Sequence, residues 1–527
     1  MKKIKLLLCL SISIASYSQQ LTLDTSYANQ GINNLGLAST TIYNNQIDGI
    51  SNASYLMTDK SMLIPFSLNP NYSMDHPNLA PTIGIKKFLE NGSLDPSFGT
   101  NGIALFTSNF HADRFEVNGI TMQPDGKIIL VGRTYLYADS SPDYEMFICR
   151  FNSDGTKDTT FGYSGLVKLN TYVVLGADSN DERLVDVTVD SQDRILAVGY
   201  NYKYLGNSTF NSSAVAIRFL PNGTVDTTFA SNGYLDINSA GIYNSFSNIY
   251  PIGTNQFLLY GTAGADLLVT KINDNGSLDT TFGVNGYSQV GFGSSTYPVK
   301  LFSQPNNEMM IVGLKVGTGL AFAKLNSDGS LDTSFSSDGK NTTYIPVPNH
   351  YNVGSESYPD ISSDHIDILP DNKFILISST RINNSYDYVI ARINEDTTLD
   401  TTFMTNGIYL NDVNAFDWAR GIHVQSDGKI VAIVGSTMYR YLNFSVLGLD
   451  NIVDSNSKIN IYPNPTNDFV HFGIKAQNAV VQDPAGKILD YFKDVNEIDF
   501  SNYTTGMYFI DIQIENGKKN IYKVIKK

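Results

Sequence analysis

One short motif occurs seven times along the chain, and this repetition constrains the fold more than any other feature. The copies read LDTSYANQG, LDPSFGTNG, KDTTFGYSG, VDTTFASNG, LDTTFGVNG, LDTSFSSDG and LDTTFMTNG. Their aspartates are Asp24, Asp95, Asp158, Asp226, Asp279, Asp332 and Asp400, at intervals of 53 to 71 residues. A repeat of this length indicates units that pack side by side, because one unit alone cannot cover its own apolar faces.

Two further patterns complete the repeat. A turn followed by an apolar run precedes the motif, as in DGKIILVG and QDRILAVG, and a basic residue lies eight positions before the aspartate in six copies. These pairs are Lys87–Asp95, Arg150–Asp158, Arg218–Asp226, Lys271–Asp279, Lys324–Asp332 and Arg392–Asp400. We therefore expect four strands in each unit. Runs such as KIILVG lack alternation, as expected for strands covered on both faces.

The two ends of the repeat are incomplete in complementary ways. Asp24 has Ser16 eight positions upstream, and Arg440 has Gly448 eight positions downstream, so neither has a local partner. These features predict an all-β fold, a seven-bladed β-propeller over residues 19–443 that its N-terminal strand closes. Closure would leave no exposed end face. The motif resembles the delta-60 repeat β-propeller family over residues 20–443, and this resemblance implies the fold but no particular activity.

The C-terminal residues differ in texture from the repeats. Residues 459–527 hold eight Lys and eight Asp or Glu, whereas the whole chain has a net charge of −15. Short apolar runs separated by DPAGK, TTG and ENGKK turns predict a small β-sandwich, joined to the propeller by a linker at 444–458.

The order of four motifs in this segment, YPNP, AGK, GMYFI and a basic KVIKK end, resembles the type A sorting domain of the type IX secretion system of Bacteroidetes. The motif residues are Tyr462, Pro463, Asn464, Pro465, Gly506 and Tyr508. The resemblance implies two partners, the type IX secretion machinery and a surface sorting peptidase that removes the domain.

Residues 1–18 are typical of a signal peptide, with a basic start, an apolar stretch and a Ser-Tyr-Ser cleavage site. That stretch is too short to span a bilayer, and we predict no membrane span elsewhere. Without the signal, Cys149 is the only thiol, and its apolar neighbours predict that it is buried. We expect a secreted, extracellular protein, either released or anchored at the outer cell surface. The negative charge argues against a nucleic-acid partner.

Catalytic signatures are missing from the sequence. There is no GxSxG, Walker A or GxGxxG motif, and none of the six histidines is spaced i, i+4 from another. We therefore assign no catalytic residue, metal or cofactor. Calcium is the one alternative, at turns such as Asn326, Asp328, Gly329 and Asp332, although Asn, Asp and Gly are also ordinary turn residues.

The repeated Asp and Phe are expected to act as scaffold. A site needed once does not require seven copies. We expect the aromatic to pack between blades and the Asp to hold the turn or pair with the basic residue. Function is better sought where the copies differ.

Charged clusters precede the first strand of several units. They are Asp113-Arg114, Asp181-Glu182-Arg183, Asp364-His365, and Asp417 with Arg420. In a propeller these segments enter the inner strands, so we expect them to converge at one mouth of the central channel. The candidate ligand-binding residues are Arg114, Arg183, Asp364, His365, Asp417, Trp418 and Arg420. The alternatives are solvated loop charges, and a Trp418 that packs between blades.

The sequence favours an exported binding or adhesion module for an extracellular carbohydrate or protein ligand. Two alternatives stay open: a secreted, carbohydrate-active hydrolase with its site at the channel mouth, and a structural component of the cell surface.

Overall fold

The computed structural model divides the chain into two compact units, Met1–Leu442 and Asn443–Lys527. The residues that it describes are 21–35, 49–51, 53–68, 82–107, 113–136, 144–169, 181–206, 209–238, 244–253, 255–304, 307–316, 318–345, 363–382, 385–404, 406–411, 418–442, 461–462, 466–483, 488–513 and 519–527. The predicted signal peptide, the predicted linker, Asp417 and residues 463–465 lie outside the described residues.

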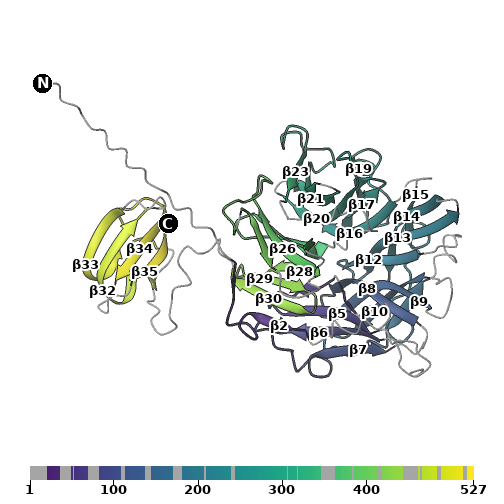
Figure 1. Ribbon diagram of the computed structural model, residues 1–527, viewed down its shortest axis with the longest axis horizontal. Helices are drawn as coiled ribbons and strands as arrows, with labels where there is room; N and C mark the ends of the chain where they lie inside the picture. The colour runs from purple at the N-terminus through teal and green to yellow at the C-terminus, as the bar shows by residue number, and fades with distance from the viewer. Residues whose placement is uncertain are drawn as a thin grey trace. The chain divides into compact units, whose positions relative to one another are not determined.

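The described part of the first unit contains seven antiparallel sheets, arranged around a common centre (Figure 1). The first sheet contains β3 (Gly49–Ile50), β4 (Tyr55–Leu56), β5 (Met62–Leu68), β6 (Thr82–Phe88) and β7 (Ile103–Thr107). The second contains β8 (Asp113–Met122), β9 (Ile128–Leu136), β10 (Tyr144–Phe151) and β11 (Leu166–Leu169). The third contains β12 (Asp181–Val189), β13 (Ile195–Gly206), β14 (Thr209–Phe219) and β15 (Tyr234–Asn238).

The remaining four sheets follow in chain order. The fourth contains β16 (Asn244–Ile252), β17 (Gln256–Ala263), β18 (Asp266–Ile272) and β19 (Tyr287–Val290). The fifth contains β20 (Thr296–Ser303), β21 (Met309–Lys315), β22 (Gly319–Leu325) and β23 (Lys340–Tyr344). The sixth contains β24 (Ile366–Ile368), β25 (Phe374–Ile382), β26 (Ser385–Ile393) and β27 (Ile408–Asn411), preceded by the 3-10 helix η2 (Ser363–His365). The seventh contains β28 (Ala419–Val424), β29 (Ile430–Val434) and β30 (Thr437–Leu442), with β1 (Thr22–Leu23) and β2 (Ile32–Asn34).

Both ends of the first unit contribute strands to the seventh sheet. Leu23 pairs with Tyr441, and Ile32 pairs with Tyr439, both antiparallel. The seventh sheet also shares a core with the first, because Val431 and Ile433 pack in one apolar cluster with Ile64. Similar clusters lie between the other neighbouring sheets.

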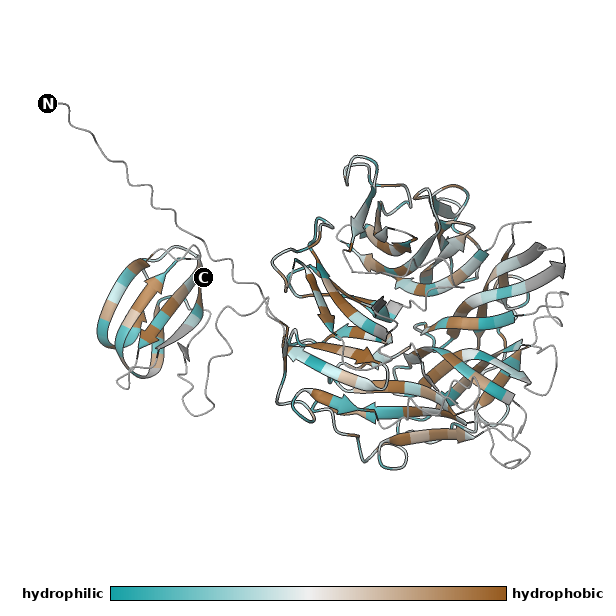
Figure 2. Ribbon diagram, viewed as in Figure 1, coloured by the Kyte–Doolittle hydropathy of each residue, from teal (hydrophilic) through white to brown (hydrophobic). Residues whose placement is uncertain are grey.

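The middle strands of each sheet are buried on both faces, which explains their continuous apolar runs (Figure 2). Cys149 on β10 is a buried free thiol, as the sequence predicted. Burial raises the pKa of this thiol far above its usual value, so it is not reactive near neutral pH.

The motif aspartates fill both of the roles considered above. Asp158 accepts hydrogen bonds at Oδ1 from the amide and hydroxyl of Thr160, while its Oδ2 lies 2.8 Å from Nε of Arg150. The same ion pair forms in all seven sheets. In the seventh sheet its members are Asp24 and Arg440, from the two ends of the unit.

The second unit contains β31 (Ile461–Tyr462), β32 (Phe469–Gln482), β33 (Ile488–Asp499), β34 (Gly506–Gln513) and β35 (Lys519–Lys526). Its strands are longer than the short strands that the sequence predicted. β32 continues through 14 residues, with an irregularity in its pairing between His471 and Ala476. The core of this unit includes Val470, Ile510 and Val524. Helices in the described part of the chain lack the length and apolar character that a membrane crossing requires.

Candidate binding site at the centre of the sheets

We call the strand of a sheet that lies nearest the common centre its inner strand. Figure 1 shows β8, β12, β16, β20 and β28 in this place, with the other labelled strands of their sheets farther out. These five inner strands contain a β-bulge at the same register, opposite the end of the apolar run in the second strand. A bulge re-aims the side chains beside it. The inner strands therefore hold the positions where side chains of different sheets meet.

A side chain bridges each of the seven joints between neighbouring sheets in the described residues, at or beside the inner strands. The bridges are Ser51 Oγ to the Val117 carbonyl, Asn118 Nδ2 to the Leu184 carbonyl, the Ile249 amide to Asp186 Oδ2, the Leu301 amide to Tyr260 Oη, Lys300 Nζ to the Ile366 carbonyl, the Val424 amide to Asp367 Oδ2, and Ser54 Oγ with His423 Nε2. These bonds tie the sheets to one another around the centre.

Asp364 is a predicted site residue that contacts other sheets. Its Oδ2 accepts hydrogen bonds from the amide and hydroxyl of Ser54, at 2.7 and 2.9 Å. The Ser54 hydroxyl lies 2.6 Å from Nε2 of His423, and that nitrogen lies 3.9 Å from the Asp364 carboxylate. Burial lowers the pKa of His423, and the negative charges of Asp364 and Asp367 only partly oppose this effect. The imidazole is therefore neutral near pH 7.

A cationic group lies close to these acids. Lys300 Nζ lies 3.5 Å from Asp367 Oδ1, and its positive charge also acts on His423. Asp367 in turn accepts the amide of Val424 at 2.8 Å. The fifth, sixth and seventh sheets thus place a cation, a carboxylate and a neutral imidazole within electrostatic range of one another.

Asp186 brings a further carboxyl group from the third sheet. Its two oxygens accept the amides of Val187 and Ile249, at 2.8 and 2.9 Å. Burial raises the pKa of Asp186 to about 6; these hydrogen bonds partly offset the increase, and the charge of Asp364 adds to it. We call Ser54, Asp186, Lys300, Asp364, Asp367 and His423 the central cluster. It offers neutral, anionic and cationic hydrogen-bonding groups, which suits recognition of a polar ligand.

The other predicted site residues that the structure describes lie outside the central cluster. Arg183 lies 3.2 Å from Asp181 and over the ring of Tyr200, and His365 is buried with Nε2 donating to the Ala419 carbonyl. Arg114 is buried on β8.

Near β28, Arg420 donates to the Gly435 carbonyl, and the Trp418 ring is partly exposed. The structure therefore brings Asp364 into the central cluster, and a ligand role for the remaining predicted residues stays a prediction.

Five members of the central cluster, all except Asp364, were not predicted, because candidates were expected only in the segments before the inner strands. Asp186 and Lys300 stand just after the bulge, where two other inner strands have Gly119 and Gly421. The signal available in the sequence was a charged residue at a position where two other inner strands have glycine.

The turn considered for calcium uses its carboxylates internally. Asp328 Oδ1 accepts the amide and hydroxyl of Ser330, and Asp332 accepts those of Ser334 and pairs with Lys324. Among the described residues, no group of three or more His, Cys, Asp or Glu side chains is arranged to hold a metal ion. Calcium binding stays untested.

Comparison with known families agrees with both resemblances. The profile of a beta-propeller domain of unknown function, DUF5122, matches residues 123–161, 304–335 and 369–403. Each match ends at the aromatic of a motif copy. The profile of a secretion system C-terminal sorting domain matches residues 460–527.

Solved structures with similarity include two very distant ones. The extracellular domain of a protein described as a hybrid two-component system from B. thetaiotaomicron is 12% identical, with 90% of this chain and 67% of that chain covered and a TM-score of 0.27. A glucose dehydrogenase is 7% identical, with 62% and 96% covered and a TM-score of 0.31. No curated protein matches the sequence.

The sorting domain indicates secretion and attachment at the outer surface. The chain therefore carries beta-propeller repeats of the DUF5122 family followed by a sorting domain of the type IX secretion system.

Proposed function

We propose that residues 19–443 form a closed seven-bladed β-propeller that acts as a binding module on the cell surface, with its ligand site at the central cluster. The pairing of β1 and β2 with β30 supports closure, and so does the apolar cluster that the first and seventh sheets share. The central cluster carries the binding proposal, because Ser54, Asp364 and His423 come from the first, sixth and seventh repeats and meet through hydrogen bonds. We expect the mature protein to lack residues 459–527 after the sorting peptidase acts.

The chemistry of the cluster favours a ligand rich in hydroxyl or amide groups, such as an extracellular carbohydrate or a protein segment. Such ligands need donors and acceptors in a fixed arrangement. Lys300 and Asp367 provide one of each, and backbone groups of the neighbouring strands hold both in place.

A glycan array and a panel of immobilised extracellular proteins would test the proposal with the whole exported protein. Asp364→Asn and Lys300→Met should each weaken binding at least about tenfold, because each removes a charged hydrogen-bonding group. Asp328→Asn, in an outer turn, is the matched control and should bind normally. Full binding by both cluster variants, with unchanged melting temperatures, would place the ligand elsewhere.

A second candidate function is hydrolysis. The observation that favours it is Asp186, whose raised pKa of about 6 lets it hold a proton at slightly acid pH near the charge of Asp364. A protonated carboxyl near an ionised one is the arrangement that acid–base hydrolysis of a glycoside uses. Chromogenic glycosides provide the assay. Turnover that Asp186→Asn abolishes would favour the hydrolase over a pure binding module.

A further inference from the structure

The junction between the fifth and sixth sheets lacks a contact that five other junctions share in the described residues. At five junctions a motif aromatic packs against the glycine of the next unit's turn. The glycines are Gly92, Gly155, Gly223, Gly276 and Gly329, and their partners are Tyr27, Phe98, Phe161, Phe229 and Phe282. A Cβ atom on any of these glycines would lie only 2.7 to 3.0 Å from the ring. Only glycine permits this contact.

A backbone hydrogen bond accompanies each of these five contacts. The residue after the aromatic donates its amide to the carbonyl just before the glycine, as from Gly162 to Asn222 at 2.8 Å. The other four bonds run from Ala28 to Asn91, Gly99 to Asp154, Ala230 to Asn275 and Gly283 to Asp328. The ring contact and the backbone hydrogen bond together hold two neighbouring sheets close to each other.

Thr397 replaces this glycine at the junction between the fifth and sixth sheets. It has a φ of 66°, and its buried hydroxyl accepts a hydrogen bond from Asn341 of β23. At the five glycine junctions a Cβ in this place would lie within 3.0 Å of the aromatic ring, so Thr397 leaves no room for Phe335 in that position. Among the described residues, Ser336 makes no bond to the Asp396 carbonyl, and Phe335 is the one motif aromatic that is not buried.

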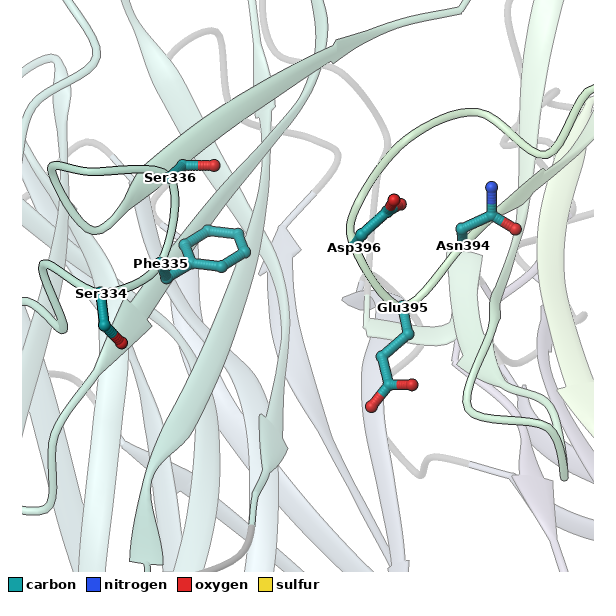
Figure 3. Close-up of a pocket in the computed structure, with 6 residues that line it drawn as sticks. All are labelled: Ser334, Phe335, Ser336, Asn394, Glu395 and Asp396. Carbon is teal, nitrogen blue, oxygen red and sulfur yellow. The ribbon is translucent and has the colours of Figure 1, made fainter.

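The result is an open cleft of about 580 Å³, which we call the Phe335 cleft. Ser334, Phe335 and Ser336 line one side, and Asn394, Glu395 and Asp396 line the other. Figure 3 shows the Phe335 ring projecting into the space between the two loops, with both carboxylates on the opposite loop. Glu395 and Asp396 are exposed.

Three intact junctions show what an aromatic in this place binds. Arg150, Arg218 and Arg440 lie over the rings of Phe161, Phe229 and Tyr27, at 4.5, 4.7 and 4.4 Å from the ring centres. The guanidinium of each also donates to a turn carbonyl of the next unit, that of Pro221, Asp274 or Glu90 respectively.

Among the residues that the structure describes, no arginine lies over the Phe335 ring. The basic residue there is Lys324, which pairs with Glu308 and Asp332 of its own unit, at 2.8 and 2.9 Å. Glu395 stands where the residues that accept the guanidinium stand in the other turns, and it adds a negative charge.

We propose that the Phe335 cleft binds an arginine side chain of a protein partner. The guanidinium lies on the Phe335 ring and pairs with Glu395 and Asp396, so an external arginine takes the place that the chain's own arginines fill elsewhere. Cation–π contact and carboxylate pairing both favour guanidinium over a neutral group. The net charge of −15 favours approach of a cationic partner. This site is separate from the central cluster and does not depend on it.

Saturation-transfer NMR with the whole exported protein would test the proposal. The probe is the peptide acetyl-Gly-Arg-Gly-amide, and the same peptide with citrulline in place of arginine is the neutral control. The arginine peptide should bind in the millimolar range and lose affinity as salt rises. The citrulline peptide should give little saturation.

Three variants separate this site from adventitious binding. Glu395→Ser introduces the residue that the preceding turn has at Ser327, and it should weaken binding about fivefold. Thr397→Gly should let Phe335 pack as at the five glycine junctions, and this should abolish binding. Phe335→Ala should also abolish binding, and it provides the test if the glycine variant does not fold. Asp328→Asn, in the preceding turn, should bind normally. Equal binding of the two peptides, or wild-type binding by Glu395→Ser and Phe335→Ala, would overturn the proposal.

Discussion

The carboxylate of Asp24 lies 2.9 Å from Nη2 of Arg440, 416 residues later in the chain. Both side chains are buried, and Arg440 also lies over the ring of Tyr27. In the other six sheets the same ion pair joins residues only eight positions apart. The ion pair that is local in the other six sheets therefore joins the two ends of the first unit in the seventh sheet.

Breaking this pair should destabilise the first unit strongly. Asp24→Ala leaves the Arg440 guanidinium buried without its carboxylate, which should cost about 3 to 5 kcal/mol of unfolding free energy. Asp279→Ala is the matched control, because the Lys271–Asp279 pair is less buried and should contribute less. Urea unfolding of both variants measures the difference. An equal loss in the two variants would mean that the end-to-end pair has no special role.

Two of the motif aspartates, Asp24 and Asp400, predict that the stability of the folded protein decreases at acid pH. Burial acts to raise the pKa of Asp24, but hydrogen bonds from Ser26 and Lys429 and the charge of Arg440 outweigh it and lower the value to about 2. Asp400 behaves in the same way, with Lys373, Thr402 and Arg392 as partners. An unfolded Asp has a pKa of about 3.9, so this stabilisation is complete above about pH 4 and is lost as the pH falls toward 2. Urea midpoints between pH 5 and pH 2 should fall steeply, and less steeply in Asp24→Asn.

Scaffold interactions could be predicted from the sequence, because they recur at fixed spacing. The eight-residue interval between Arg150 and Asp158 is a hairpin distance, and six copies at this spacing made the ion pair and the turn visible. The buried aromatics follow in the same way. Their partner glycines lie in the turn of the next sheet, and they recur at five junctions.

Most of the central cluster could not be predicted from the sequence. Its members meet only because inner strands that are far apart in the sequence lie side by side. The bulges decide which side chains face one another. Ser54 and Asp364 are 310 positions apart, and no local pattern links them. Thr397, in contrast, was visible as the one NSDG-type turn with Thr in place of Gly, but its consequence for Phe335 required the structure.

Asp186 should show the opposite pH dependence to Asp24. Its folded-state pKa of about 6 exceeds the unfolded value of about 3.9, so the folded protein holds this proton more tightly. Its contribution to stability therefore decreases as pH rises from about 4 to about 6 and is constant above that. Carboxyl-carbon NMR titration should give a midpoint near pH 6. A midpoint near pH 4 would remove the support that Asp186 gives to the hydrolase.

Repeated and unrepeated residues should respond differently to substitution. Phe229 is buried against Gly276 and under Arg218, so Phe229→Ala should cost about 3 to 5 kcal/mol. Arg183 makes a partly exposed pair with Asp181, so Arg183→Ala should change stability by less than about 1 kcal/mol. Thermal unfolding distinguishes the two. A large loss for Arg183→Ala would make it a structural residue and end its candidacy as a ligand contact.

Removing residues 459–527 should change the destination of the protein and leave the first unit folded. The two units are separate in their contacts, and the second has its own core around Val470 and Ile510. The truncated protein should therefore keep the melting temperature of the first unit and accumulate in the periplasm, because the sorting domain is its export address. Cell fractionation and mass spectrometry provide the measurement, with the full chain as control.

In the full chain, peptides from residues 459–527 should be missing from surface material once the sorting peptidase has acted. Surface protein that retains these peptides would show that the domain stays attached after export, and its well-packed core would then serve the mature protein as well.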